Sequence, residues 1–106
     1  LKNVRFTSNS YELEKTSFIE LNKLTAYLKK NPNLQIEIQG HTDDVGDEID
    51  NQILSEKRAK TVFEYLKIKV SNSLSYKGFG ESTPLESNAT KKGRTINRRT
   101  SFIIVD

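Results

Sequence analysis

The apolar positions along this chain follow two different periods. From Leu34 to Gln39, apolar and polar residues alternate strictly, which predicts a strand with one buried face. In residues 15–30, and again from about 51 to 69, apolar residues recur every three or four positions, which predicts two amphipathic helices. Helical and strand patterns therefore alternate along the first two thirds of the chain.

The first of these helices, from about Lys15 to Lys30, also carries signals at its ends. Ser17-Phe18-Ile19-Glu20 fits a capping box at the start. Asn31-Pro32 ends the helix, because proline disfavours helical geometry in the residue before it. The predicted buried stripes of the two helices consist of Phe18, Leu21, Leu24, Tyr27 and Leu28, and of Ala59, Val62, Phe63, Leu66 and Val70.

Three further strands complete the predicted order. Residues 4–6 form a short edge strand, and residues 74–80 and 100–105 form the last two, separated by a polar loop that contains Pro84, Asn88 and Gly93. The order is β-α-β-α-β-β. Because crossover connections are right-handed, we expect both helices on one face of a mixed sheet. The fold class is then an α+β sandwich, and we expect residues 1–106 to form a single domain.

Composition and charge exclude several classes of protein. Of the 106 residues, 34% are hydrophobic and 29% are charged. The net charge of +3 comes from basic residues scattered among acidic ones, which does not fit a nucleic-acid-binding face. The run Ile103-Ile104-Val105 is far shorter than a membrane span, so a membrane could be reached only through a segment outside this chain. The absence of cysteine excludes disulfides and thiolate chemistry.

Candidate residues for metal binding or catalysis are few. His41 is the only histidine, and zinc normally requires several nitrogen or sulfur ligands. The acidic run after it (Asp44, Asp47, Glu48 and Asp50) lacks the spacing of a calcium loop and fits a solvated turn. No Gly-x-Ser-x-Gly motif is present. We therefore expect no metal, no cofactor and no enzymatic activity.

One pair of opposite charges stands out. Asp43 follows the alternating strand, and Arg58 lies early in the second helix, so both belong to neighbouring elements. The residues alone favour a structural salt bridge. The alternative is a binding site for a ligand that carries both an ammonium and a carboxylate, because a guanidinium binds carboxylates in a planar, bidentate geometry.

Five short blocks occur in order along the sequence. They are Gly40-His41-Thr42-Asp43; Gly46; Asn51 with Leu54-Ser55 and Arg58-Ala59; Gly78 with Gly80-Glu81 and Pro84; and Asn97-Arg98-Arg99. Together these blocks resemble the OmpA-like peptidoglycan-binding domain. The resemblance implies noncovalent binding of the diaminopimelate side chain in Gram-negative peptidoglycan stems.

The resemblance also implies roles for particular residues. Asp43 would accept the ligand's ammonium, and Arg58 would pair with its carboxylate. Arg98 would approach the same carboxylate, with a structural role as its alternative. The residues implied for the pocket wall are Thr42, Asn51, Leu54 and, in the turn after the first strand, Asn9.

The same resemblance implies a periplasmic domain, associated with the outer membrane, that anchors the envelope to the cell wall. The anchor upstream of such a domain is a porin-like barrel, a lipidated N-terminus, or the transmembrane helix of a stator or secretion complex. A protein-interaction module whose wall pocket is vestigial remains the alternative of a different class. The sequence leaves dimerisation open.

Overall fold

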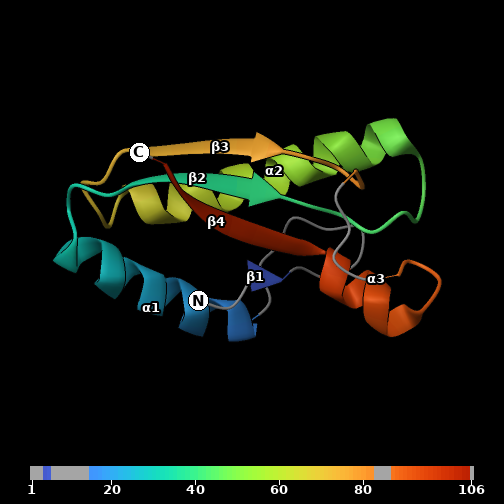
Figure 1. Cartoon of the computed structure of the whole chain (residues 1–106), viewed down its shortest axis with the longest axis horizontal. Helices are drawn as coiled ribbons and strands as arrows, with labels where there is room; N and C mark the ends of the chain where they lie inside the picture. The colour runs from blue at the N-terminus through green and yellow to red at the C-terminus, as the bar shows by residue number, and fades with distance from the viewer. Residues whose placement is uncertain (1–3, 6–14, 83–86, 106) are drawn as a thin grey trace.

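The computed structural model describes residues 4–5, 15–82 and 87–105 of the chain (Figure 1). Its elements follow in the order β1 (Val4–Arg5), α1 (Lys15–Lys30), β2 (Gln35–Gly40), α2 (Glu48–Lys67), β3 (Leu74–Gly78), α3 (Lys91–Asn97) and β4 (Arg99–Val105).

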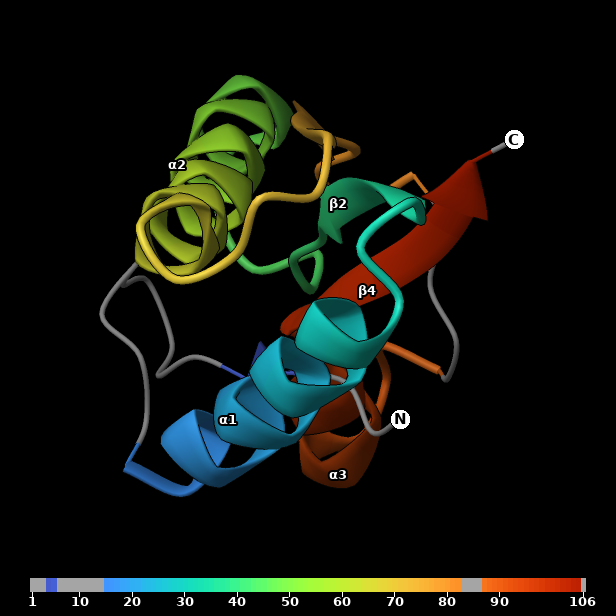
Figure 2. The ribbon, with the colours of Figure 1, turned by 90° about the vertical axis from the view of Figure 1, so that its left-hand side faces the viewer.

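The strands form one mixed sheet in the order β1-β4-β2-β3. β2 and β3 are parallel, with Gly40 beside Gly78 at their carboxyl ends. β4 runs antiparallel to β2 and places Thr100 beside Gly40, and the short β1 pairs with the start of β4. Helices α1 and α2 lie on the same side of this sheet (Figure 2). The predicted α+β class is confirmed.

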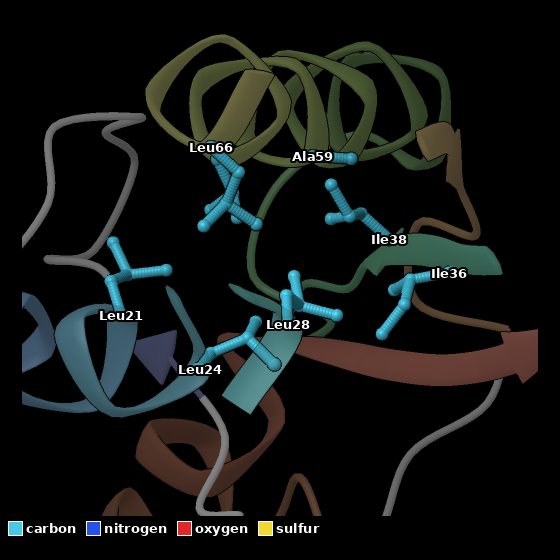
Figure 3. Packing of buried hydrophobic residues seen from close by; sticks show 8 residues of the cluster. Leu21, Leu24, Leu28, Ile36, Ile38, Ala59 and Leu66 are labelled. Carbon is cyan, nitrogen blue, oxygen red and sulfur yellow. The ribbon is translucent and has the colours of Figure 1, made fainter. Parts of the chain in front are cut away.

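The apolar core fills the space between the two long helices and β2 (Figure 3). The alternation predicted for β2 is confirmed, because Ile36 and Ile38 are buried whereas Glu37 and Gln39, which alternate with them, are only half-buried. Fully burying one such side chain stabilises the fold by about 1.5–3 kcal/mol. The core consists of Leu21, Leu24 and Leu28 from α1, Ile36 and Ile38 from β2, and Ala59, Val62 and Leu66 from α2.

The ends of the two long helices differ in part from the prediction. α1 spans the predicted residues, but Ser17 lies inside its first turn, so the predicted capping box is wrong. α2 begins at Glu48, about three residues earlier than predicted. The reason is Asp47, whose Oδ1 accepts the N–H of Ile49 at 3.0 Å and caps the helix. The start of α2 thus moves toward the acidic turn.

A third helix, α3, occupies part of the segment predicted to be a polar loop. It has only seven residues, too few for an apolar stripe to identify it. Its start depends on a local contact, because Oγ1 of Thr90 accepts the N–H of Gly93 at 2.9 Å. The helix ends directly before Arg98 and Arg99, and it therefore decides where these two side chains enter the sheet.

Candidate functional site

A cavity of about 320 Å³ lies where β2 ends, between the loop that follows β2, the start of α2 and the end of α3. These segments meet at the right-hand end of the molecule in Figure 1. The cavity is lined by Thr42, Asp43, Val45, Gly46, Asp47, Asp50, Asn51, Leu54, Arg58 and Arg98.

Close packing of β2 against α2 brings the two sides of this cavity together. Gly40 makes the approach possible, because a Cβ at this position would overlap the main-chain carbonyl of Ser55. Ser55 in turn fixes the end of β3, since its Oγ accepts the N–H of Gly80 at 2.8 Å. Gly80 then accepts the N–H of Thr42 at 2.9 Å. The strand ends and the first turns of α2 are thereby held as one unit.

The loop that forms the outer wall is held by Asp43 and Asn51. Oδ1 of Asp43 accepts the N–H of Val45 at 3.1 Å. Nδ2 of Asn51 donates to the carbonyl oxygens of Asp43 at 3.3 Å and of Val45 at 3.1 Å. Gly46 has φ of +92°, a left-handed conformation that favours glycine. Asn51 therefore positions the loop as well as lining the cavity.

Three charged side chains meet at the inner end of the cavity. Nη1 of Arg98 donates to Oδ2 of Asp43 at 2.9 Å. Nη1 of Arg58 donates to the main-chain oxygen of His41 at 3.2 Å. Asp43 is 4% exposed and Arg58 is fully buried. The salt bridge considered for Asp43 with Arg58 is thus replaced by one with Arg98, a residue 55 positions away in the sequence.

Arg58 is a buried charge that remains protonated at neutral pH. Burial, together with the positive charge of Arg98, lowers the pKa of Arg58 to about 10, although the carboxylate of Asp43 acts in the opposite direction. The inner end of the cavity therefore holds two guanidinium groups and one carboxylate. This excess of positive charge favours an anionic group of a ligand.

Two further polar atoms on cavity-lining residues are buried and have no hydrogen-bond partner among the described residues. They are Oγ1 of Thr42 and Nε of Arg98. A buried polar atom without a partner typically costs about 1–3 kcal/mol. Both atoms can donate a hydrogen bond to an acceptor of a ligand, and the described residues leave these two donors unused.

His41 supports the site from outside the cavity. It is 3% exposed, and its ring stacks on Phe79 with the centroids 5.4 Å apart. Burial and, to a smaller extent, the nearby charge of Arg99 lower the pKa of His41 to about 4, so the ring is neutral at physiological pH. The main-chain N–H of His41 donates to the carbonyl of Arg99 at 2.8 Å, which joins β2 to the start of β4.

Six of the seven residues named from the sequence line the same cavity, and Asn9 lies outside the described residues. The sequence analysis missed the acidic mouth of the cavity, formed by Asp47 and Asp50. These residues were interpreted as part of a solvated turn, and both are indeed exposed. The helix-capping position of Asp47 was the available signal, since it places the turn at the start of α2. The six residues are Thr42, Asp43, Asn51, Leu54, Arg58 and Arg98.

Within the described part of the chain, no group of three or more His, Cys, Asp or Glu side chains is arranged to hold a metal ion. None of the helices in residues 15–82 and 87–105 is long and apolar enough to cross a membrane.

Known proteins have sequences similar to that of this chain. Outer membrane porin F of Pseudomonas aeruginosa is 35% identical over 99 residues, which cover 91% of this chain and 28% of the porin. Peptidoglycan-binding protein ArfA of Mycobacterium tuberculosis is 33% identical over 103 residues, covering 95% of this chain and 32% of that protein. The chain thus spans about a third of the length of these relatives.

The fold comparison agrees. The crystal structure of the peptidoglycan-associated lipoprotein from Burkholderia pseudomallei superposes with a TM-score of 0.91 at 27% identity, covering 99% of this chain and 91% of that one. A sequence model of the OmpA family matches residues 5–98. The chain belongs to the OmpA family.

Proposed function

We propose that this domain binds peptidoglycan noncovalently, through the diaminopimelate residue of the stem peptide, and so anchors an outer-membrane protein or envelope complex to the cell wall. Two relatives support the general partner. One is described as a peptidoglycan-binding protein and the other as a peptidoglycan-associated lipoprotein.

The observation that carries the proposal is one cavity with both signs of charge at its inner end. The far end of diaminopimelate carries an ammonium and a carboxylate on the same carbon. Asp43 is the acceptor for the ammonium, and Arg58 pairs with the carboxylate. Thr42 offers a hydroxyl, and Leu54 an apolar wall. Asn9 remains a predicted wall residue.

Affinity at each site need not be high for anchoring. Solvated ion pairs contribute only about 0–1 kcal/mol each, and the partly buried pairs here also lose solvation when they form. A polymer presents many identical stems, and a tethered domain meets them at high effective concentration. Many modest contacts then hold the envelope to the wall.

Binding of this kind breaks no bond in the ligand and needs no cofactor, so the proposed domain is not an enzyme. Its proposed location is the periplasm, in association with the outer membrane. The anchor itself belongs to a part of the protein outside this chain. Dimerisation is not required, because all the proposed ligand contacts come from one copy.

The test is a titration with a diaminopimelate-containing stem peptide, followed by amide NMR. We expect saturable shifts around residues 40–46 and 58 in the wild-type domain. Asp43→Asn and Arg58→Lys should abolish the shifts, because the first removes the acceptor's charge and the second removes the planar donor fork. Lys60→Gln, on the exposed side of the same helix, is the control and should bind normally.

Folding of each variant is checked by its own spectrum. If the folded wild type shows no shifts at millimolar peptide, the proposal is wrong, and the alternative of a protein-interaction module with a vestigial pocket gains support. Binding that persists in both charge variants would contradict the assigned roles of Asp43 and Arg58.

A further inference from the structure

In the structure, the carboxylate assigned to the ligand's ammonium is already occupied. Both oxygens of Asp43 have partners: Oδ1 accepts the N–H of Val45 at 3.1 Å, and Oδ2 accepts Nη1 of Arg98 at 2.9 Å. The side chains of Asp43 and Arg98 are 6% and 16% exposed. An incoming ammonium therefore meets a carboxylate that is largely buried and already neutralised.

The guanidinium of Arg98 has two hydrogen-bonded nitrogens and a third that has no hydrogen-bond partner among the described residues. Its Nη2 donates to Oγ1 of Thr95 in α3 at 3.0 Å, whereas its buried Nε has no hydrogen-bond partner among the described residues. The residue also lines the cavity. Its guanidinium thus has a spare donor for a ligand acceptor while the group as a whole stays anchored to α3.

We propose that Arg98 is an internal counter-ion that the ligand must exchange, and that this exchange makes the pocket selective for zwitterions; the inference rests on the proposed function. The ligand's ammonium takes Oδ2 of Asp43, and Arg98 transfers its charge pairing to the ligand's carboxylate. The number of ion pairs is conserved. No buried charge is left without a partner, which would be costly.

A ligand with an ammonium alone cannot complete the exchange. The lysine side chain of a lysine-type stem would displace Arg98 from Asp43 and offer nothing in return. Two guanidinium groups, those of Arg58 and Arg98, would then lie beside the ligand's positive charge with Asp43 as their common anion. Specificity here comes from a penalty on the wrong ligand, in addition to attraction of the right one.

Removal of Arg98 and removal of Arg58 should affect the binding of the lysine-type stem, the wrong ligand, differently. Removing Arg58 removes a partner of the right ligand but leaves Oδ2 of Asp43 paired with Arg98, so the wrong ligand must still displace Arg98. Removing Arg98 frees Asp43, so the wrong ligand should bind better than before. The two arginines are therefore distinguishable by experiment even though both line the same cavity.

The experiment measures the Kd of the domain for two matched stem peptides, one with diaminopimelate and one with lysine, in the wild type and in Arg98→Gln. We expect Arg98→Gln to bind the lysine-type stem more tightly than the wild type does. The preference for diaminopimelate should fall by about tenfold or more, as expected when one charge pair in a desolvated site is lost. Lys92→Gln removes an equal charge from an exposed position of α3, the helix that ends directly before Arg98, and should change neither Kd.

Lysine-type binding that is unchanged or weaker in folded Arg98→Gln would overturn the inference while leaving the proposed function intact. A wild type that binds neither stem would overturn both. A second measurement needs no variant: the Nε–H signal of Arg98 in the wild type should shift on saturation with the diaminopimelate stem. A signal that stays in place at saturation would overturn the exchange even if Arg98→Gln fails to fold.

Discussion

The two halves of α2 bury the same face of one helix with opposite chemistry. The C-terminal half buries apolar residues: Ala59, Val62 and Leu66. The N-terminal half, beside the cavity, buries polar or charged ones: Asn51, Ser55 and Arg58. Both halves pack against the sheet, so burial alone does not distinguish them.

The difference shows which part of the helix stabilises the fold and which part forms the site. Apolar burial gives a favourable free energy that does not depend on exact partners. A buried guanidinium or amide must be matched by hydrogen bonds and charges merely to offset its lost solvation. The N-terminal half is organised around such matches: Asn51 to the loop, Ser55 to Gly80, and Arg58 to His41.

The largest effect on stability should come from Leu66→Ala in the apolar half. Leu66 is fully buried in the core, and a cavity left by Leu→Ala typically costs about 2–5 kcal/mol in the free energy of unfolding. Urea unfolding measures this change. At urea concentrations below the unfolding transition, the Kd for the stem peptide should stay near the wild-type value, because Leu66 does not line the cavity. Lys67→Ala, one position along and exposed, should change stability by less than about 0.5 kcal/mol.

A loss below 1 kcal/mol in Leu66→Ala would contradict the division of α2 into a stabilising half and a site-forming half. Loss of binding in the still-folded variant would contradict it equally.

The second-largest effect should be a loss of stability at acidic pH, caused by His41 beside the cavity. The pKa of His41 is lowered to about 4 in the folded state, against 6.5 in the unfolded chain. Between these values the unfolded state binds more protons, so stability falls as the pH drops below about 6.5 and levels off near 4. From pH 7 to pH 5 the expected loss is about 2 kcal/mol. Unfolding curves at several pH values measure it.

His41→Tyr is the matched variant, because it keeps an aromatic ring at this position without a group that titrates in that range. The difference between the variant and the wild type should account for the loss attributed to His41. Parallel curves for the two proteins between pH 7 and pH 5 would contradict a buried, neutral His41.

The smallest effect on stability should come from Arg58→Met, although binding should be lost. The change removes a buried charge while keeping an apolar chain of similar length, and Asp43 retains its ion pair with Arg98. Replacing a buried ion pair by apolar groups is often neutral or stabilising, and removing one charge is costly only when its partner is left unpaired, whereas Asp43 here keeps Arg98. We therefore expect a change of less than about 1 kcal/mol in the unfolding free energy. Calorimetry with and without the stem peptide measures both quantities.

A loss above 2 kcal/mol in Arg58→Met would mean that Arg58 is a structural residue, as the sequence alone had favoured. The assignment of the buried polar residues of α2 to the site, and not to the stability of the fold, would then be wrong.

The sequence by itself determined the elements whose residues repeat over many positions. The alternation in β2 and most of the apolar positions predicted for α1 and α2 reflect burial of one face, although Phe18 and Tyr27 of α1 are exposed. Asp43 and Arg58 were found as a pair of opposite charges on neighbouring elements, and Thr42 was implied by the resemblance of its motif to the OmpA-like domain. Only the tertiary structure showed that these residues line one cavity.

Two features were not predicted from the sequence. α3 was missed because its seven residues carry no long stripe and its start depends on one local contact of Thr90. The partner of Asp43 was decided by the tertiary structure alone. The helix preceding Arg98 and the pairing of β4 with β2 bring that side chain across 55 positions of sequence to Asp43. A contact at such a distance depends on how the elements pack, and no periodicity within either segment records it.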